Sequence, residues 1–244
     1  MRTRPNGFTL VEMAVVLVII GLLLAGLMMP LSAQVEQRRI DETRKAMDEI
    51  TQALIGFALT ANGRLPCPAN PTVASGTAGA GTETNTGPNG SCVSNPGVVP
   101  WATLGLNETD AWNRRYTYRV TGSFADGLDG AGAAGATPPC GAPRAGVSFE
   151  LCSTGDNTVL AAAAGATLAS NIPAVIISHG PNGLGGYTST GAQIGVSGDA
   201  DEAENSDGDA TFVSHTPTTT FDDLVTWLSP NTLMNRMVTA GRLP

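Results

Sequence analysis

The feature that most constrains this 244-residue chain is an apolar run from Phe8 to Leu31, which contains a single charged residue, Glu12. As an α-helix, about 24 residues extend roughly 36 Å, enough to cross a hydrocarbon core of about 30 Å. Arg2 and Arg4 precede the run, and basic residues in that position keep an N-terminus cytoplasmic. The sequence therefore predicts a transmembrane helix segment over residues 8–31, with the rest of the chain outside the cytoplasm.

The hydropathy of the run is also compatible with two simpler interpretations. A cleavable secretory signal peptide would use Leu31-Ser32-Ala33 as its cut site, but its apolar region is usually only about 7–15 residues long. A plain single-span anchor explains the length of the run. Neither interpretation explains a carboxylate inside it, because an intramembrane charge is costly and usually marks a function.

The residues around the start of the run resemble a known processing site. Gly7-Phe8-Thr9-Leu10-Val11-Glu12 is similar to the prepilin peptidase motif of type IV pilins and type II secretion pseudopilins, and the likeness extends over residues 2–31. This resemblance implies that residues 1–7 are a leader peptide, which a prepilin peptidase removes by cutting between Gly7 and Phe8. It also implies methylation of the new amino terminus on Phe8.

The same resemblance implies a role in filament assembly for Glu12. It lies four residues, or about 6 Å of helix, beyond the cut. The family implies that the charged amino terminus of Phe8 on an adjacent subunit is its partner. We expect this pair to set the axial register when a subunit enters a helical filament of pilin or pseudopilin subunits.

The helix is predicted to continue beyond the apolar run, through residues 32–62. Pro30 is expected to kink it or to melt one turn, and Asn62-Gly63 is a helix stop. The charged residues from Glu36 to Lys45 mix both signs, as on a solvated helix. Apolar residues then recur at helical spacing and predict a face that packs on the globular body. These residues are Met47, Ile50, Leu54, Phe57, Ala58 and Ala61.

Residues 63–244 are predicted to form an extracytoplasmic, β-rich globular domain. The 30 glycines and 16 prolines indicate long loops, and Thr72–Ser91 is predicted to be a flexible one. Alternation or β-branched content predicts strands, and Ser229-Pro230 followed by Gly241 predicts a short C-terminal helix. The strand candidates are Arg115–Val120, Val147–Leu151 and Pro173–Ser178. The predicted fold class is α+β, with a long helix packed on an antiparallel sheet, as the family resemblance also implies.

The four cysteines suit export to an oxidising compartment. Four cysteines allow three pairings. We favour Cys67–Cys92 with Cys140–Cys152, because each pair brackets a Gly/Pro-rich loop near its ends. The tetrapeptide Gly-Arg-Leu-Pro occurs at 63–66 and again at 241–244, and we assign it no function.

An acidic loop over residues 199–209 is the one candidate metal site. Dense oxygen donors suit Ca²⁺, and major pseudopilins carry a Ca²⁺ site in a loop near the C-terminus. The spacing is not that of an EF-hand, because Ala210 stands where the turn glycine belongs. The alternative is a solvated acidic loop. The candidate ligands are Asp199, Asp201, Glu204, Asp207 and Asp209, and we expect no cofactor other than this Ca²⁺.

Charge and residue content narrow the function class. A net charge of −8 disfavours nucleic acid as a partner. His179 and His215 are the only near-neutral bases, and we interpret both as loop or surface residues of a protein that is not an enzyme. We expect a structural filament subunit in the bacterial inner membrane that enters a filament in the periplasm or on the cell surface. A type II secretion pseudopilin is favoured; the alternatives are a minor type IV pilus subunit and a filament-tip binding or adhesion module.

Overall fold

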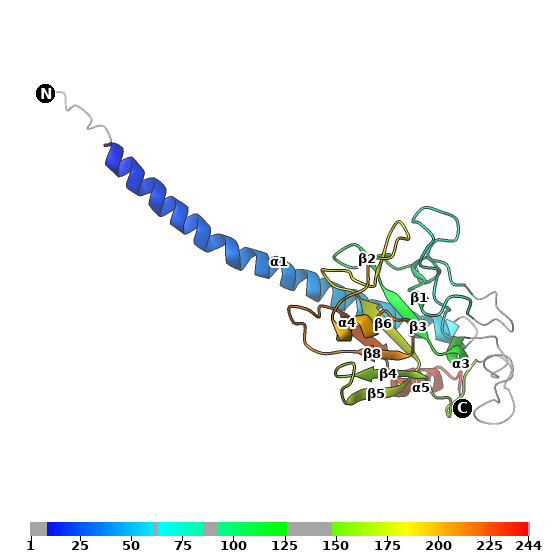
Figure 1. The fold of residues 1–244 in the computed structure, drawn as a ribbon. Helices are drawn as coiled ribbons and strands as arrows, with labels where there is room; N and C mark the ends of the chain where they lie inside the picture. The colour runs from blue at the N-terminus through cyan, green and yellow to red at the C-terminus, as the bar shows by residue number, and fades with distance from the viewer. Residues whose placement is uncertain (1–8, 61–62, 85–91, 126–147, 244) are drawn as a thin grey trace. The chain divides into compact units, whose positions relative to one another are not determined.

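The computed structural model describes residues 9–60, 63–84, 92–125 and 148–243, without the side chains of residues 23–32. The chain divides into two compact units, Met1–Asp41 and Glu42–Pro244. The elements in chain order are α1 (Leu10–Thr60), β1 (Gly97–Val98), α2 (Trp101–Leu104), β2 (Arg114–Arg115), β3 (Thr117–Val120), α3 (Gly122–Ala125), β4 (Asn157–Leu160), β5 (Thr167–Ile172), β6 (Ala174–Ser178), β7 (Tyr187–Thr188), α4 (Ala200–Glu204), β8 (Thr211–Val213), β9 (Leu224–Leu228) and α5 (Pro230–Thr239) (Figure 1).

Helix α1 confirms the predicted long N-terminal helix, with Leu10 and Thr60 as its ends. The predicted ends Phe8 and Ala61 lie outside the described residues. No turn is melted at Pro30, since the helix is uninterrupted there. A proline inside a helix removes its own N–H from the ladder and crowds the carbonyl four residues earlier. The helix nevertheless continues through residue 30 without a break.

The part of α1 that belongs to the second unit has the predicted apolar face. Met47, Ile50, Leu54 and Ala58 are almost completely buried, and Ile55 joins them. Phe57, which the spacing also assigns to this face, is only half-buried. The helical period therefore identifies the face, and the second unit covers it.

The main sheet has the strand order β1-β3-β6-β9, and every neighbouring pair is antiparallel. This confirms the predicted antiparallel sheet. Strand β6 agrees with the predicted strand Pro173–Ser178, and all five of its residues are buried. A central strand with both faces covered needs apolar side chains on both faces, which explains its continuous Ala-Val-Ile-Ile pattern.

A second sheet, with the order β5-β4-β8, packs against one face of the first. Strands β4 and β8 are parallel, so the body is not purely antiparallel as predicted. The two sheets share a small apolar cluster. Its buried members are Val159, Ile172, Val175, Ile177 and Phe212.

Two further sequence predictions have different outcomes. The strand predicted at Val147–Leu151 is wrong over its described residues, which form no strand. Phe149 instead stacks on Phe124 with ring centroids 4.8 Å apart, so burial of the aromatic ring explains the apolar position. The predicted C-terminal helix is confirmed as α5, with Pro230 in its first turn.

Candidate functional site

The first candidate site is the start of α1, where Thr9 and Glu12 bind each other. Glu12 Oε2 accepts hydrogen bonds from the Thr9 amide and the Thr9 hydroxyl, both at 2.8 Å. The Glu12 amide donates in return to Thr9 Oγ1 at 3.3 Å. This reciprocal arrangement is a capping box, and the Thr-x-x-Glu pattern is its sequence signature. From the sequence, Glu12 was expected only to pair with another subunit, so this role within the chain was not predicted.

The side chains that follow the cap are exposed in the isolated chain. Leu10 is 87% exposed and Leu22 70% exposed, and the large apolar residues between them are 44–71% exposed. Among the described residues, no helix is both long and apolar enough to span a membrane. Phe8 and the side chains from residue 23 onward lie outside the described part of the structure. The transmembrane segment over residues 8–31 therefore stays a prediction. Gly7 and Phe8 of the predicted cut also lie outside the described part.

The acidic loop does not gather its five predicted ligands in one place. Asp199 is the N-cap of α4, and hydrogen bonds from the Thr220 side chain and the Asp201 amide lower its pKa. Asp201 accepts from the Ala163 amide at 2.6 Å and lies 3.2 Å from His215 Nε2. These two aspartates therefore serve local structure.

The other three predicted ligands do come together. Carboxylate oxygens of Glu204, Asp207 and Asp209 lie within 4.8 Å of one another, and we name this set the exposed loop cluster. Burial raises the pKa of Glu204, and the charges of Asp207 and Asp209 add to the effect. Both aspartates are exposed, and each accepts a hydrogen bond from the backbone amide of the residue two positions later in the chain. The geometry is that of an acidic turn that could hold a cation.

A second acidic set was missed as a site. Glu202, on α4, meets Asp222 and Asp223, which directly precede β9, with oxygens of all three within 4.8 Å. We name this set the buried carboxylate cluster. Glu202 and Asp223 are buried and Asp222 is partly buried. Burial raises the pKa of Asp222 to about 7, and the nearby Glu202 and Asp223 charges act in the same direction. The acidic pair between Phe221 and Leu224 is the sequence signal that could have indicated buried carboxylates.

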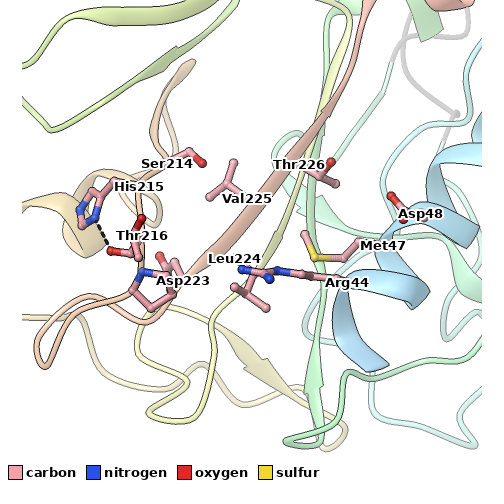
Figure 2. Close-up of a pocket in the computed structure, with 11 residues that line it drawn as sticks. Arg44, Met47, Asp48, Ser214, His215, Thr216, Asp223, Leu224, Val225 and Thr226 are labelled. Carbon is pink, nitrogen blue, oxygen red and sulfur yellow. Dashed lines mark hydrogen bonds between the residues drawn. The ribbon is translucent and has the colours of Figure 1, made fainter. Parts of the chain in front are cut away.

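One residue of the buried carboxylate cluster, Asp223, lines a cleft of about 470 Å³ between the α1 residues of the second unit and β9. Figure 2 shows Asp223 and His215 on one side of this cleft and Arg44, Met47 and Asp48 on the other. His215 lies in a loop and stacks on Phe221, in agreement with its interpretation. His179 follows β6 in a loop but is completely buried, so a surface position for it is wrong.

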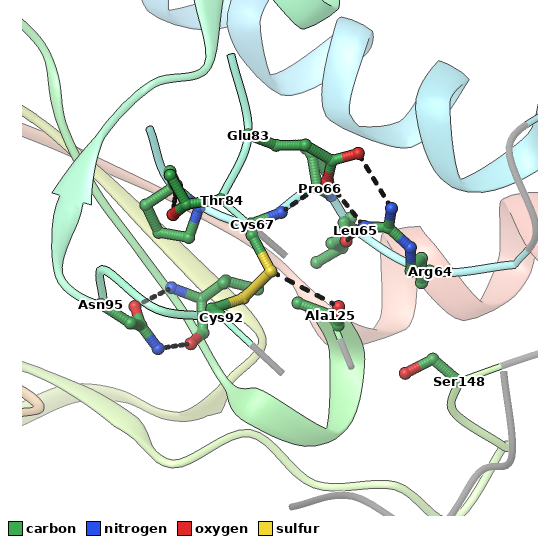
Figure 3. The surroundings of a disulfide bond; sticks show 12 residues. Arg64, Leu65, Pro66, Cys67, Glu83, Thr84, Cys92, Asn95, Ala125 and Ser148 are labelled. Atoms are coloured by element: carbon green, nitrogen blue, oxygen red, sulfur yellow. Dashed lines mark hydrogen bonds and ion pairs between the residues drawn. A yellow bond between two sulfur atoms is a disulfide. The ribbon is translucent and has the colours of Figure 1, made fainter. Parts of the chain in front are cut away.

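The disulfide between Cys67 and Cys92 confirms the first predicted pairing (Figure 3). The Cys67 amide donates to Glu83 Oε2 at 3.2 Å, and its sulfur lies 3.7 Å from the Ala125 carbonyl oxygen. The second predicted pairing, Cys140–Cys152, includes Cys140, which lies outside the described residues. That pairing remains a prediction.

Residues 2–28 match the family described as the prokaryotic N-terminal methylation motif. No curated protein and no solved structure matches the chain. The motif implies processing by prepilin peptidase and targeting to the inner membrane, in a class of proteins that are generally not enzymes. With a long N-terminal helix followed by antiparallel sheets, the chain has a pilin-like α+β arrangement and carries the N-terminal methylation motif that is typical of type IV pilins and type II secretion pseudopilins.

Proposed function

We propose that this protein is a structural subunit of a type IV pilus-like filament. Prepilin peptidase cuts it between Gly7 and Phe8 and methylates Phe8. The subunit then stays in the bacterial inner membrane through residues 8–31, with a cytoplasmic N-terminus and a periplasmic body, until it enters the filament. The methylation motif at residues 2–28 is the observation that carries this proposal.

The capping box supports a specific role for Glu12 in assembly. Both hydrogen bonds that its carboxylate accepts use Oε2, so among the described residues Oε1 keeps its capacity for a further donor. The cut lies before Thr9, so the processed chain retains the capping box. We propose that the amino terminus of Phe8 on an adjacent subunit donates to Glu12, whose orientation Thr9 maintains.

Exposed apolar side chains on the same helix support the proposed environment. An uncovered apolar surface from Leu10 to Leu22 is unfavourable in water, at about 25 cal/mol per Å². Lipid removes this surface from water before assembly, and neighbouring helices do so within a filament.

The experiment co-expresses the chain with prepilin peptidase and filament partner subunits. The mature chain is expected to begin at Phe8 and to carry one added methyl group by mass spectrometry. Glu12→Leu should be processed normally but enter filaments poorly, and Thr9→Ala should show a weaker form of the same defect. The control is Gln37→Ala, an exposed change on the same helix. If Glu12→Leu enters filaments as well as the unaltered chain, the assembly role is wrong.

Among filaments, we propose the type II secretion pseudofilament. Support comes from the order of the segment Ser178–Gly183 and the acidic loop, which is similar to that of major pseudopilins. In this setting the exposed loop cluster of Glu204, Asp207 and Asp209 binds Ca²⁺. The double variant Asp207→Asn with Asp209→Asn should lose a Ca²⁺-dependent increase in melting temperature. An unchanged increase contradicts this Ca²⁺ site and leaves the filament role untouched.

A minor pilus subunit is the second candidate, including a tip module for binding or adhesion. The long loop closed by Cys67–Cys92 favours it, because binding residues of proteins are often carried on loops that a rigid scaffold positions. Deletion strains separate the two candidates. Loss of protein secretion supports the pseudopilin, and loss of surface pili or adhesion supports the minor subunit.

A further inference from the structure

We propose that a cleft between α1 and the segment 107–111 binds a guanidinium group. The cleft has a volume of about 310 Å³, and we name it the Tyr116 cleft. It shares no residue with the two acidic clusters described above, and its ligand is independent of the filament that the chain enters. Its polar lining residues include Glu42, Lys45, Glu49, Asn107, Asp110 and Tyr116.

One wall of the cleft is a single side of α1. Glu42, Lys45, Ala46 and Glu49 line it, and their spacing of three and four positions places them on one face of the helix. Glu49 lies 3.8 Å from Lys45, and both side chains are exposed. Glu42 has no hydrogen bond or ion pair with any described residue. This wall therefore offers a carboxylate with no competing partner.

The opposite wall is the segment 107–111, which hydrogen bonds hold in place. The carboxylate of Asp110 accepts from two backbone amides at 2.9 Å and from the Ser178 hydroxyl at 2.6 Å. The Ala111 amide donates to Thr43 Oγ1 at 3.4 Å, which joins the segment to α1. Both walls are therefore fixed by the folded body, and Asp110 contributes its charge more than a free oxygen.

Tyr116 supplies an independent observation. It lines the cleft and is only 1% exposed. Its hydroxyl is buried and has no hydrogen-bond partner among the described residues. Tyr118, which is also completely buried, donates instead to the Pro66 carbonyl at 3.1 Å. A buried polar atom without a partner is rare in proteins and calls for a ligand or another specific explanation.

The surrounding charges indicate what kind of ligand suits this hydroxyl. Burial raises the pKa of Tyr116 well above its usual value, and the charges of Asp110, Glu42 and Glu49 add to the effect. All three carboxylates line the same cleft, so the hydroxyl lies on the cleft side of the residue. It stays protonated at neutral pH and lies in a negative potential that favours a cation.

The carboxylates of the cleft are too far apart for all three to bind one metal ion. Among the described residues, the sets of three whose oxygens lie within 4.8 Å of one another are the two acidic clusters, and neither includes a residue of this cleft. A larger cation with several N–H donors can reach acceptors that are spread over a cavity. Organic ligands usually occupy pockets of about 300–1,000 Å³, and this cleft has a volume at the lower end of that range.

A guanidinium group is the organic cation that fits these acceptors. It is planar and has five N–H donors, so it can form two parallel bonds with one carboxylate and still donate to another acceptor. An ammonium group is a compact point charge with three donors. In the Tyr116 cleft, the guanidinium pairs with the Glu42 carboxylate and donates to the Tyr116 hydroxyl oxygen.

Two sources can supply this group. One is a free guanidinium compound, and the other is an arginine side chain of a second copy of this chain. A second copy offers Arg38, Arg44 and Arg236, which are exposed and have no ion pair with any described residue. Both sources would use the same acceptors, so the experiment first tests the chemistry and then separates the sources.

The experiment uses the full chain in detergent with N-acetyl-L-arginine amide as the probe. N-acetyl-L-citrulline amide, an uncharged compound of nearly the same shape, is the matched control. Affinity is measured on the NMR signals of the probes, and ¹⁵N-tyrosine labelling locates the site, since the chain has three tyrosines. We expect the arginine compound to bind about tenfold more tightly than the citrulline compound. It should shift the signal of Tyr116 and leave those of Tyr118 and Tyr187 unchanged.

Two variants test the named acceptors. Tyr116→Phe removes only the hydroxyl without a partner, so the body should stay folded while the arginine compound binds about tenfold more weakly. Glu42→Gln removes one exposed charge and should weaken binding severalfold. Tyr187→Phe makes the same change outside the cleft, and Asp48→Asn removes a charge from the part of α1 that lines the other cleft (Figure 2). Neither control should alter binding.

Three results overturn the proposal. Equal affinity for the two compounds would show that the cleft does not recognise the positive charge. A shift of Tyr187 without a shift of Tyr116 would place the binding elsewhere. Equal losses in Glu42→Gln and Asp48→Asn would show attraction to the net charge of the chain alone.

Dilution of the protein without a probe separates the two sources. A Tyr116 signal that changes on dilution, and that the arginine compound restores, supports the site with an arginine of a second copy as its ligand. An unchanged signal together with binding of the arginine compound supports the site with a free compound as its ligand. None of these results depends on Glu12 or on filament entry.

Discussion

Arg64 and Glu83 form a two-pronged ion pair, with Nη1 2.8 Å from Oε2 and Nη2 2.9 Å from Oε1. The two side chains are only 11% and 17% exposed. Glu83 also accepts from the Cys67 amide, so one carboxylate joins the segment after α1 to the start of the disulfide loop (Figure 3). A charge-assisted pair that is shielded from water stabilises more than one on the surface.

Glu83→Gln should lower the free energy of unfolding by about 2–3 kcal/mol, because it leaves the Arg64 guanidinium poorly compensated. Urea unfolding in detergent measures the change. Glu49→Gln is the control, since Glu49 pairs with Lys45 at 3.8 Å on an exposed helix surface. That variant should change stability by less than about 0.5 kcal/mol. Equal effects would contradict the structural role of Arg64–Glu83.

The Cys67–Cys92 bond should stabilise the body by restricting the unfolded chain. The double variant Cys67→Ala with Cys92→Ala is expected to lose about 3–4 kcal/mol for a loop of this length, by the chain-entropy relation. Non-reducing peptide maps of the unaltered chain test both pairings, including Cys140–Cys152. An unchanged unfolding midpoint in the double variant would show that the disulfide bond contributes little to stability.

Leu54→Ala should cost about 2–5 kcal/mol, because Leu54 is completely buried on the packed face of α1. Gln52→Ala tests the opposite side of the same helix, where the side chain is exposed, and should stay within about 0.5 kcal/mol. Chemical unfolding of both variants makes the comparison. Similar losses would mean that this part of α1 does not pack as described.

Asp110 should make the folded state less stable as pH rises. Burial raises the pKa of Asp110, although the Ser178 hydroxyl at 2.6 Å and two backbone amides oppose the effect. Between the unfolded pKa near 3.8 and the higher folded pKa, the folded state binds more protons, so stability falls with increasing pH. Asp110→Asn should remove this loss. The stability of the unaltered chain minus that of the variant should decrease from about pH 4 to pH 7.

Asp156 provides a control of opposite sign. Burial alone would raise the pKa of Asp156, but hydrogen bonds from Arg119 and Thr121 and the Arg119 charge outweigh it and lower the pKa. Its contribution is present above the unfolded pKa and is lost as pH falls through the lower folded pKa. Stability relative to Asp156→Asn should therefore decrease in acid, below about pH 4. The same slope for both aspartates would contradict the pKa assignments.

The spacing of apolar residues along the sequence predicted the helices and strands whose residues are close together in the chain. The helical spacing of Met47, Ile50 and Leu54 identified a buried face, and the apolar run Ala174–Ser178 identified a central strand. Strand β5 was missed, because most of its residues are exposed and its sequence lacks an alternating apolar pattern. Val147–Leu151 alternates like a strand, but its one large ring pairs with Phe124 from a distant segment.

The Gly-Arg-Leu-Pro repeat acquires a structural meaning in the folded chain. Gly63 and Gly241 have φ values of 66° and 67°, just after the ends of α1 and α5. The following residues Leu65 and Leu243 are both buried, as expected when a left-handed glycine ends a helix and turns the chain back on the core. Arg242 then donates to the Leu59 carbonyl at 2.8 Å, near the end of α1.

The sequence by itself determined the N-terminal features of this protein. The processing motif and the Thr9–Glu12 capping box each involve residues within a few positions of one another, so local order is enough to specify them. The tertiary structure alone decided which acidic residues meet. Asp222 and Asp223 lie 20 and 21 positions from Glu202 in the chain, and they meet it where they precede β9, the strand that pairs with β6. The positions of the carboxylates can be read from the sequence, but the packing of the sheets determines which carboxylates are buried next to one another.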